Sequence, residues 1–249
     1  MTSDIGTRAS SRRDLPRPTR RAGAVLTVAI IVIALGCAAL GWAVGRSTTG
    51  ESGAVSATDP NPVVVPDSVP VVAFIGDSYS QGIGASTIGS RWTTLAAASM
   101  GWSELNLSEG GTGYTTSYEG KQTDYSTKIA EVAAAKPDIV VISGGRNDYQ
   151  AGNSTVAGTA AVTLLGMLHS VVPDADLVVV SPVWDSSVPP EEFDEMANGI
   201  EMAAVSSGVE FVNIGEPLAA HPEMMAADGL HPNDAGHHAI AERVVGKFR

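Results

Sequence analysis

The stretch Val71-Val72-Ala73-Phe74-Ile75-Gly76-Asp77-Ser78-Tyr79-Ser80 decides the fold. Its first five residues are apolar and predict a short buried strand over 71–75. The glycine, aspartate and serine that follow end this strand in a turn. If a helix begins there, its free backbone N–H groups surround the hydroxyl of Ser78, which is the setting that a nucleophile needs. The same three residues are common in ordinary turns, so this stretch alone does not establish any chemistry.

Strand-like and helix-like segments alternate from residue 70 to the end of the chain. Strands are predicted at 71–75, 104–107, 138–143, 176–181 and 209–214, and helices near 89–100, 124–135, 154–171, 191–206 and 234–248. The apolar runs 139–142 and 177–180 are typical of strands that are buried on both faces. This pattern predicts one α/β domain over 70–249, with a three-layer α/β/α architecture and a mainly parallel five-stranded sheet.

An uncharged apolar segment, residues 22–45, precedes this domain. A helix of that length is roughly 36 Å long at about 1.5 Å per residue, which is enough to span a hydrocarbon layer of about 30 Å. Six arginines lie in residues 1–21, whereas only Arg46 follows closely. The positive-inside rule therefore predicts a basic cytoplasmic tail (1–21), a transmembrane helix (22–45) and an extracytoplasmic remainder. Residues 46–69 are rich in Ser, Thr, Gly and Pro and predict a linker.

Other interpretations of the N-terminal region remain open. A cleaved secretory signal would release the domain, but the apolar core is long for one and the small-residue site Val55-Ser56-Ala57 lies well beyond it. Ser11-Arg12-Arg13-Asp14-Leu15 resembles a twin-arginine export signal, and Ala34-Leu35-Gly36-Cys37 resembles a lipoprotein cleavage box. The apolar run continues past Cys37, which favours an uncleaved anchor.

Charge and cysteine content exclude several classes of function. Residues 1–21 hold six arginines and two acids, so the rest of the chain, with 9 basic and 25 acidic residues, has a net charge of −16. Such a surface repels nucleic acid, and no nucleic-acid partner is expected. Cys37 is the sole cysteine. The domain beyond the anchor therefore has no disulfide, no cysteine nucleophile and no cysteine-based metal site.

Three further turns are placed to meet Ser78. Residues 110–113 follow the second predicted strand, residues 144–148 follow the third, and residues 228–232 precede the last predicted helix. The carboxyl ends of parallel strands share one edge of a sheet, and ligands bind there. We therefore expect these turns to converge on one site.

With these blocks the chain resembles the SGNH hydrolases, also called GDSL-type esterases. The four blocks are Gly76-Asp77-Ser78-Tyr79-Ser80, Asn106-Leu107-Ser108-Glu109-Gly110-Gly111, Gly145-Arg146-Asn147-Asp148 and Asp228-Gly229-Leu230-His231-Pro232. They occur in the family's order, and the resemblance covers residues 71–249. It implies a flavodoxin-like fold and a carboxylic ester hydrolase that needs no metal or cofactor.

The resemblance also implies a role for each candidate site residue. Ser78 would attack the ester carbonyl, His231 would take and return the proton, and Asp228 would orient the imidazole. The oxyanion hole would consist of the backbone N–H groups of Ser78 and Gly111 and the side-chain amide of Asn147. Gly110 is adjacent to Gly111, so the register of this donor stays open by one residue.

The substrate is less well defined by the sequence. Members of the family act on lipids, thioesters, short acyl esters and acetylated polysaccharides. No long apolar insertion provides a lid for a long acyl chain, and an outward-facing domain would meet envelope glycans. The expected substrate is therefore a short-acyl ester, such as an O-acetyl group on an envelope glycan. An acyltransferase that uses a sugar hydroxyl as acceptor and a non-catalytic glycan-binding module are the alternatives.

Four aromatic residues near the strand ends, Tyr79, Tyr114, Tyr149 and Trp184, either line an acyl or sugar pocket or pack against the loops, and packing is the favoured prediction. The remaining histidines have no partner at a suitable spacing and are assigned no role.

Overall fold

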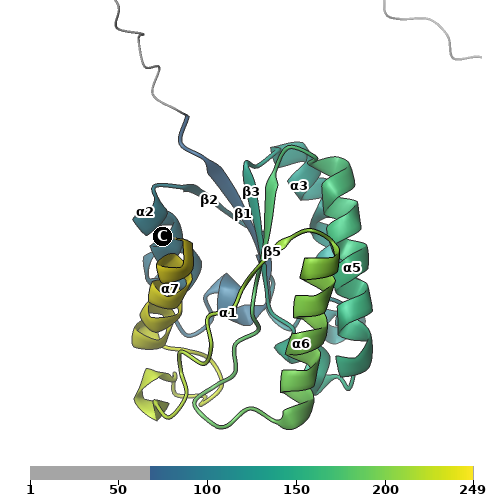
Figure 1. Cartoon of the computed structure of the whole chain (residues 1–249). Helices are drawn as coiled ribbons and strands as arrows, with labels where there is room; N and C mark the ends of the chain where they lie inside the picture. The colour runs from purple at the N-terminus through teal and green to yellow at the C-terminus, as the bar shows by residue number, and fades with distance from the viewer. Residues whose placement is uncertain (1–67, 249) are drawn as a thin grey trace, which may run out of the picture. The chain divides into compact units, whose positions relative to one another are not determined.

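A computed structural model of the chain describes residues 68–248 (Figure 1). The predicted tail (1–21), the predicted transmembrane helix (22–45) and nearly all of the predicted linker (46–69) lie outside these residues. Of the described helices, only α5 (Ser154–Val171) is long and apolar enough to cross a membrane. Leu164, Leu165 and Leu168 of this helix are buried against the sheet, as expected of a core helix.

A single parallel sheet forms the centre of the domain. Its strands are β1 (Val71–Gly76), β2 (Ser103–Asn106), β3 (Ile139–Ser143), β4 (Asp176–Val180) and β5 (Glu210–Val212). They lie in the order β2-β1-β3-β4-β5, and every neighbouring pair is parallel. The predicted five-stranded parallel α/β fold is confirmed.

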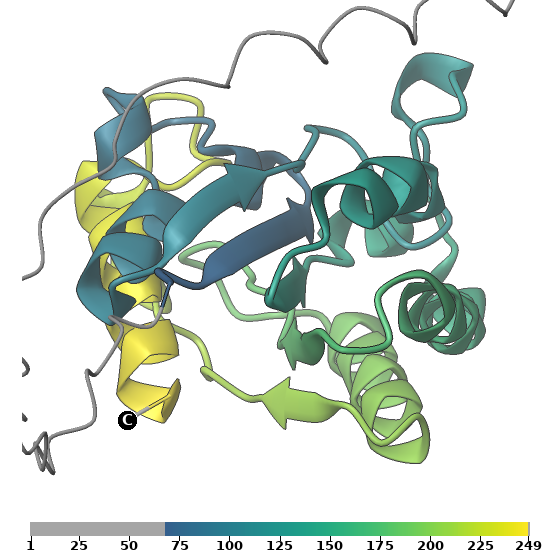
Figure 2. The same ribbon diagram turned by 90° about the horizontal axis from the view of Figure 1, so that it is seen from above.

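Helices cover both faces of the sheet (Figures 1 and 2). One face packs against α2 (Trp92–Met100) and α7 (Asp234–Phe248), and the other against α3 (Ile129–Ala135), α5 and α6 (Glu191–Ser206). Alternate residues of β1, β3 and β4 supply the two cores: Phe74 points toward α2 and α7, whereas its neighbour Ile75 belongs to the opposite core. Each such buried side chain contributes about 1.5–3 kcal/mol to folding.

Two short helices are not predicted by the sequence pattern. α1 (Ser78–Gln81) begins where β1 ends, and α4 (Arg146–Gln150) follows β3 in the same way. Within residues 68–248, four single-turn 3-10 helices also occur: η1 (Ile88–Ser90), η2 (Tyr118–Gly120), η3 (Tyr125–Lys128) and η4 (Pro222–Met224). The predicted helix at 124–135 consists of η3 and α3. Elements of three to five residues are too short to show a hydrophobic period, so only the turn signals mark their positions.

Candidate active site

The turn after β1 places Ser78 at the start of α1. Asp77 caps this helix, because its Oδ1 accepts the backbone N–H of Tyr79 at 2.9 Å. Gly76 is required by packing: a Cβ there would lie 2.5 Å from Ser80 Oγ and 2.6 Å from the carbonyl oxygen of Ser143. The side chain of Ser78 lines a cavity instead of entering the core.

The carboxyl group of Asp77 is buried directly beneath this turn, with 4% of the residue exposed. Burial raises the pKa of Asp77 to about 6, while the N–H of Tyr79 and the nearby Arg146 act in the opposite direction. Asp77 thus stabilises the local backbone, but burial of its carboxylate charge lowers the stability of the folded chain.

This burial predicts a pH-dependent effect of Asp77→Asn on stability. Because the pKa of Asp77 is about 6 in the folded chain and 3.8 for an aspartate in water, the folded chain binds more protons in that window, and stability falls as pH rises through it. The full penalty is about 3 kcal/mol above pH 6. Asparagine keeps the acceptor for Tyr79 but carries no charge. We expect the unfolding free energy of the variant, relative to wild type, to rise by about 1–3 kcal/mol between pH 4 and pH 7.

Urea denaturation of both proteins across this pH range measures the difference. A difference that does not change with pH would show that the Asp77 carboxyl titrates normally in the folded protein.

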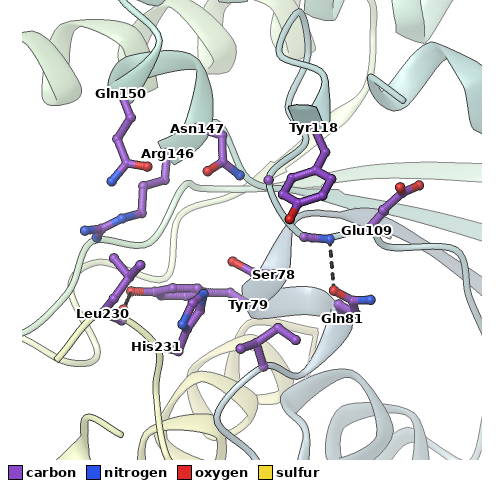
Figure 3. Close-up of a pocket in the computed structure, with 13 residues that line it drawn as sticks. Ser78, Tyr79, Gln81, Glu109, Tyr118, Arg146, Asn147, Gln150, Leu230 and His231 are labelled. Carbon is purple, nitrogen blue, oxygen red and sulfur yellow. Dashed lines mark hydrogen bonds between the residues drawn. The ribbon is translucent and has the colours of Figure 1, made fainter. Parts of the chain in front are cut away.

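The turn before α7 pairs His231 with Asp228. Nδ1 of His231 lies 2.7 Å from Oδ2 of Asp228, and Oδ1 of Asp228 accepts the backbone N–H groups of Leu230 and His231 at 2.9 and 3.0 Å. The hydrogen bond from the imidazole, together with these two backbone bonds, holds the pKa of Asp228 well below its usual range. Asp228 is therefore a carboxylate at neutral pH. Since it engages Nδ1, the other ring nitrogen of His231 is left for the cavity that His231 and Ser78 both line (Figure 3).

Two contacts hold the His231 turn against the segment that carries Ser78. The hydroxyl of Tyr79 donates to the carbonyl of Leu230 at 2.6 Å (Figure 3). Further on, Gly84 packs so closely against Pro232 that a Cβ would clash with the carbonyl oxygen of Pro232. Tyr79 and Gly84, which follow the serine in the sequence, thus position the turn that carries the histidine, although 151 residues separate Tyr79 from Leu230.

The loop after β2 supplies the candidate oxyanion donor. The backbone N–H of Gly110 donates to Oε1 of Gln81 at 2.9 Å, whereas no residue in 68–248 accepts the N–H of Gly111. This arrangement favours Gly111 in the register that the sequence left open. Nδ2 of Asn147 donates to the carbonyl of Thr112 at 2.8 Å. An amide nitrogen carries two hydrogens, so the second N–H of Asn147 is free to donate to a ligand in the cavity that Asn147 lines.

Asp148 anchors this loop, a role that the sequence analysis did not assign. It is fully buried and accepts the backbone N–H groups of Tyr114, Thr115 and Thr116 and the hydroxyls of the two threonines, at 2.8–3.1 Å. A Cβ on Gly113 would clash with its carboxylate. The acidic residue next to Asn147 thus connects the third block to the second. The feature of the sequence that hints at this role is an acidic residue in a glycine-rich turn.

One cavity of about 550 Å³ brings the candidate residues together. Its lining comprises Ser78, Tyr79, Gln81, Ile83, Glu109, Gly110, Gly111, Tyr118, Arg146, Asn147, Gln150, Leu230 and His231 (Figure 3). Of the four aromatic residues considered from the sequence, Tyr79 lines it, Tyr114 and Trp184 are buried in the core, and the partly buried Tyr149 packs against that core. Tyr118, which the sequence analysis did not single out, is an additional lining residue.

A three-layer parallel α/β domain whose strand-end cavity contains a serine, a carboxylate-paired histidine and amide donors belongs to the class of α/β hydrolytic enzymes. The chain is a member of the GDSL-like lipase/acylhydrolase family, whose sequence profile matches residues 74–239. This confirms the resemblance to the SGNH hydrolases, and the protein is a carboxylic ester hydrolase.

Individual relatives agree with this assignment. GDSL lipase Rv0518 of Mycobacterium tuberculosis is 29% identical over 191 residues, which cover 70% of this chain and 79% of the relative. Two solved structures share the fold at lower identity. Est24, a carbohydrate acetylesterase from Sinorhizobium meliloti, aligns with a TM-score of 0.57 at 19% identity, over 72% of this chain and 98% of its own. A family two carbohydrate esterase from Cellvibrio japonicus aligns with a TM-score of 0.61 at 15% identity, over 73% of this chain and 62% of its own.

Proposed function

We propose that this protein is an extracytoplasmic serine esterase that removes short acyl groups, such as O-acetyl groups of envelope glycans, through an acyl-enzyme on Ser78. The observation that carries the proposal is the shared cavity, in which Ser78, His231, Gly111 and Asn147 lie together while Asp228 holds the imidazole. Nucleophilic ester hydrolysis requires this set of groups.

The first half of the reaction forms the acyl-enzyme. Oγ of Ser78 attacks the carbonyl carbon as His231 takes its proton, and Asp228 stabilises the resulting imidazolium. The oxyanion accepts the N–H groups of Ser78 and Gly111 and the amide of Asn147, and each donor contributes about 10²–10³ in rate. The intermediate then expels the alcohol, which receives the proton from His231.

The second half releases the acid. Water enters, gives a proton to His231 and attacks the acyl carbon. The second tetrahedral intermediate collapses with the departure of Ser78 Oγ, which regains the proton. Enzyme and histidine return to their starting states, and the products are one alcohol and one carboxylic acid.

The cavity supports a short acyl group on a polar alcohol. Its volume of about 550 Å³ must hold both halves of the ester, and its lining includes tyrosine, amide and charged side chains beside the aliphatic Ile83 and Leu230. The carbohydrate esterases that share the fold are named for substrates of this kind. The extracytoplasmic location is supported by the predicted membrane anchor at 22–45 and the arginines before it.

Acyl-chain preference tests the proposal. We expect kcat/KM of the purified protein to be at least about tenfold higher for p-nitrophenyl acetate than for p-nitrophenyl palmitate, because a long chain would leave apolar surface in water. Equal values for the two esters would contradict a short-acyl preference. Product analysis with and without a glycan acceptor separates the alternative of acyl transfer, which would yield an acylated sugar at the expense of free acid.

A further inference from the structure

The ring of Tyr118 is an exposed aromatic side chain on the wall of the active-site cavity. Tyr118 is 43% exposed, whereas Tyr79, the other aromatic residue in the lining, is 5% exposed. An exposed tyrosine at the edge of a pocket can contact a ligand without any rearrangement of the core.

The loop that carries Tyr118 is closed by its own hydrogen bonds. Ser117 Oγ accepts the backbone N–H groups of Thr123 and Asp124 at 3.2 Å each, and Thr123 Oγ1 accepts the N–H of Tyr118 at 2.8 Å. At its tip, Glu119 has a φ of 49°, a left-handed conformation that costs a non-glycine residue about 1–2 kcal/mol. Asp148 anchors the strand-proximal end of the loop. The loop thus holds the ring beside the cavity at a local energetic cost.

The ring meets the candidate oxyanion loop with its edge. A Cβ added to Gly111 would clash with Cδ2 of Tyr118 and lie 3.3 Å from both Cγ and Cε2. These two distances are equal and long, which places the added Cβ in the plane of the ring, at its edge. If the Cβ lay above the ring face, it would be closer to both Cγ and Cε2. Gly111 therefore uses neither face of the ring, and Nζ of Lys121 lies over one face at 5.7 Å from the ring centroid. In Figure 3 Tyr118 and His231 lie on opposite sides of Ser78.

The charged residues of the lining are already neutralised by partners. Glu109 forms an ion pair with Lys128 at 2.8 Å, and the guanidinium of Arg146 lies 2.8 Å from Asp185. Gln81, Gln150 and Asn147 supply uncharged amides to the same lining. The cavity therefore offers hydrogen-bonding groups and an aromatic face without an uncompensated charge.

We propose that Tyr118 is a substrate-specificity residue that binds the ring of a neutral pyranoside ester. The negative face of an aromatic ring attracts slightly positive C–H groups, and one face of a pyranose presents such groups. The amides of Gln81 and Gln150 are placed to bind the hydroxyls of the same sugar. The inference rests on the proposed esterase function and specifies its substrate class.

The test compares two acetate esters with the full-length protein. Methyl glucopyranoside acetate carries the sugar, whereas ethyl acetate presents the same acyl group without it. We expect Tyr118→Ala to lower kcat/KM for the sugar ester about 3- to 10-fold, mainly through KM, and to leave ethyl acetate within about twofold. Tyr118→Phe and Tyr118→Trp should retain the sugar ester activity. Gln122→Ala, on the same loop but outside the lining, is the matched control and should behave as wild type.

Each other result overturns the inference in a distinct way. An equal loss for both esters would show that Tyr118 merely supports the Gly111 loop, and no loss for either would show that the ring does not contact substrate. Wild-type activity on ethyl acetate without any on the sugar ester would refute the sugar subsite and retain the esterase. Inactivity of the wild type on both esters would refute the proposed function itself.

Discussion

Replacement of Ser78 by alanine is expected to lower kcat for p-nitrophenyl acetate by about 10⁴- to 10⁶-fold, the range typical of a lost nucleophile. The physical reason is that no acyl-enzyme forms, so that only direct attack by water on a bound ester remains. Residual activity above the uncatalysed rate would come from the oxyanion donors and from binding. Initial rates with the purified variant, measured beside wild type, give the ratio.

Ser80→Ala is the matched control for this change. Ser80 lies in the same helix, α1, but is buried and does not line the cavity. The control should retain activity within about tenfold, since it removes one hydroxyl from the same turn without touching the reacting atoms. Loss of activity in both variants to the same degree would indicate that the turn had collapsed, and near-normal activity of Ser78→Ala would refute the assignment.

Asp228→Asn is expected to lower kcat by up to about 10⁴-fold at neutral pH. Asparagine can still accept the backbone N–H groups of Leu230 and His231 through its oxygen, so the turn should fold. Its amide nitrogen, however, would face Nδ1 of His231 as a donor, which favours the wrong imidazole tautomer and removes the charge that stabilises imidazolium. Steady-state kinetics with p-nitrophenyl acetate measure the loss.

The pair His221 and Glu223 offers a control with the same chemistry at a different place. Nδ1 of His221 lies 2.8 Å from Oε1 of Glu223, and neither residue lines the active-site cavity. Glu223→Gln should leave kcat within about twofold of wild type. If Asp228→Asn were as harmless as this control, the carboxylate would have no part in the reaction.

The sheet could be predicted from the sequence because each strand carries a strong local signal. Runs such as Ile139–Ile142 are apolar at every position, and their burial on both faces follows from the helices between them. Three of the site turns were predictable for a related reason: they follow strands of a parallel sheet, where the topology brings them to one edge, whereas the turn at 228–232 precedes α7. The strand boundaries differ from prediction by one or two residues, as at β2, where pairing with β1 begins at Ser103.

The contacts within the site could not be predicted, since they join distant segments. The hydrogen bond from Tyr79 to Leu230 spans 151 residues, and the anchoring of Thr115 by Asp148 spans 33. Likewise, the choice between Gly110 and Gly111 depends on Gln81, which reaches across from α1. Tyr118 was missed because an aromatic residue in a polar loop gives no periodic signal, and its place beside the cavity is set by tertiary hydrogen bonds.

Covalent labelling of the full-length protein with a fluorophosphonate, followed by intact-mass and peptide mass spectrometry, tests whether Ser78 is an activated nucleophile. Such reagents phosphonylate serines that are activated by a neighbouring base. We expect one adduct per chain, located on Ser78, that forms in parallel with loss of esterase activity and is absent from Ser78→Ala. An adduct on another serine, or full esterase activity in a chain that is labelled at Ser78, would contradict it.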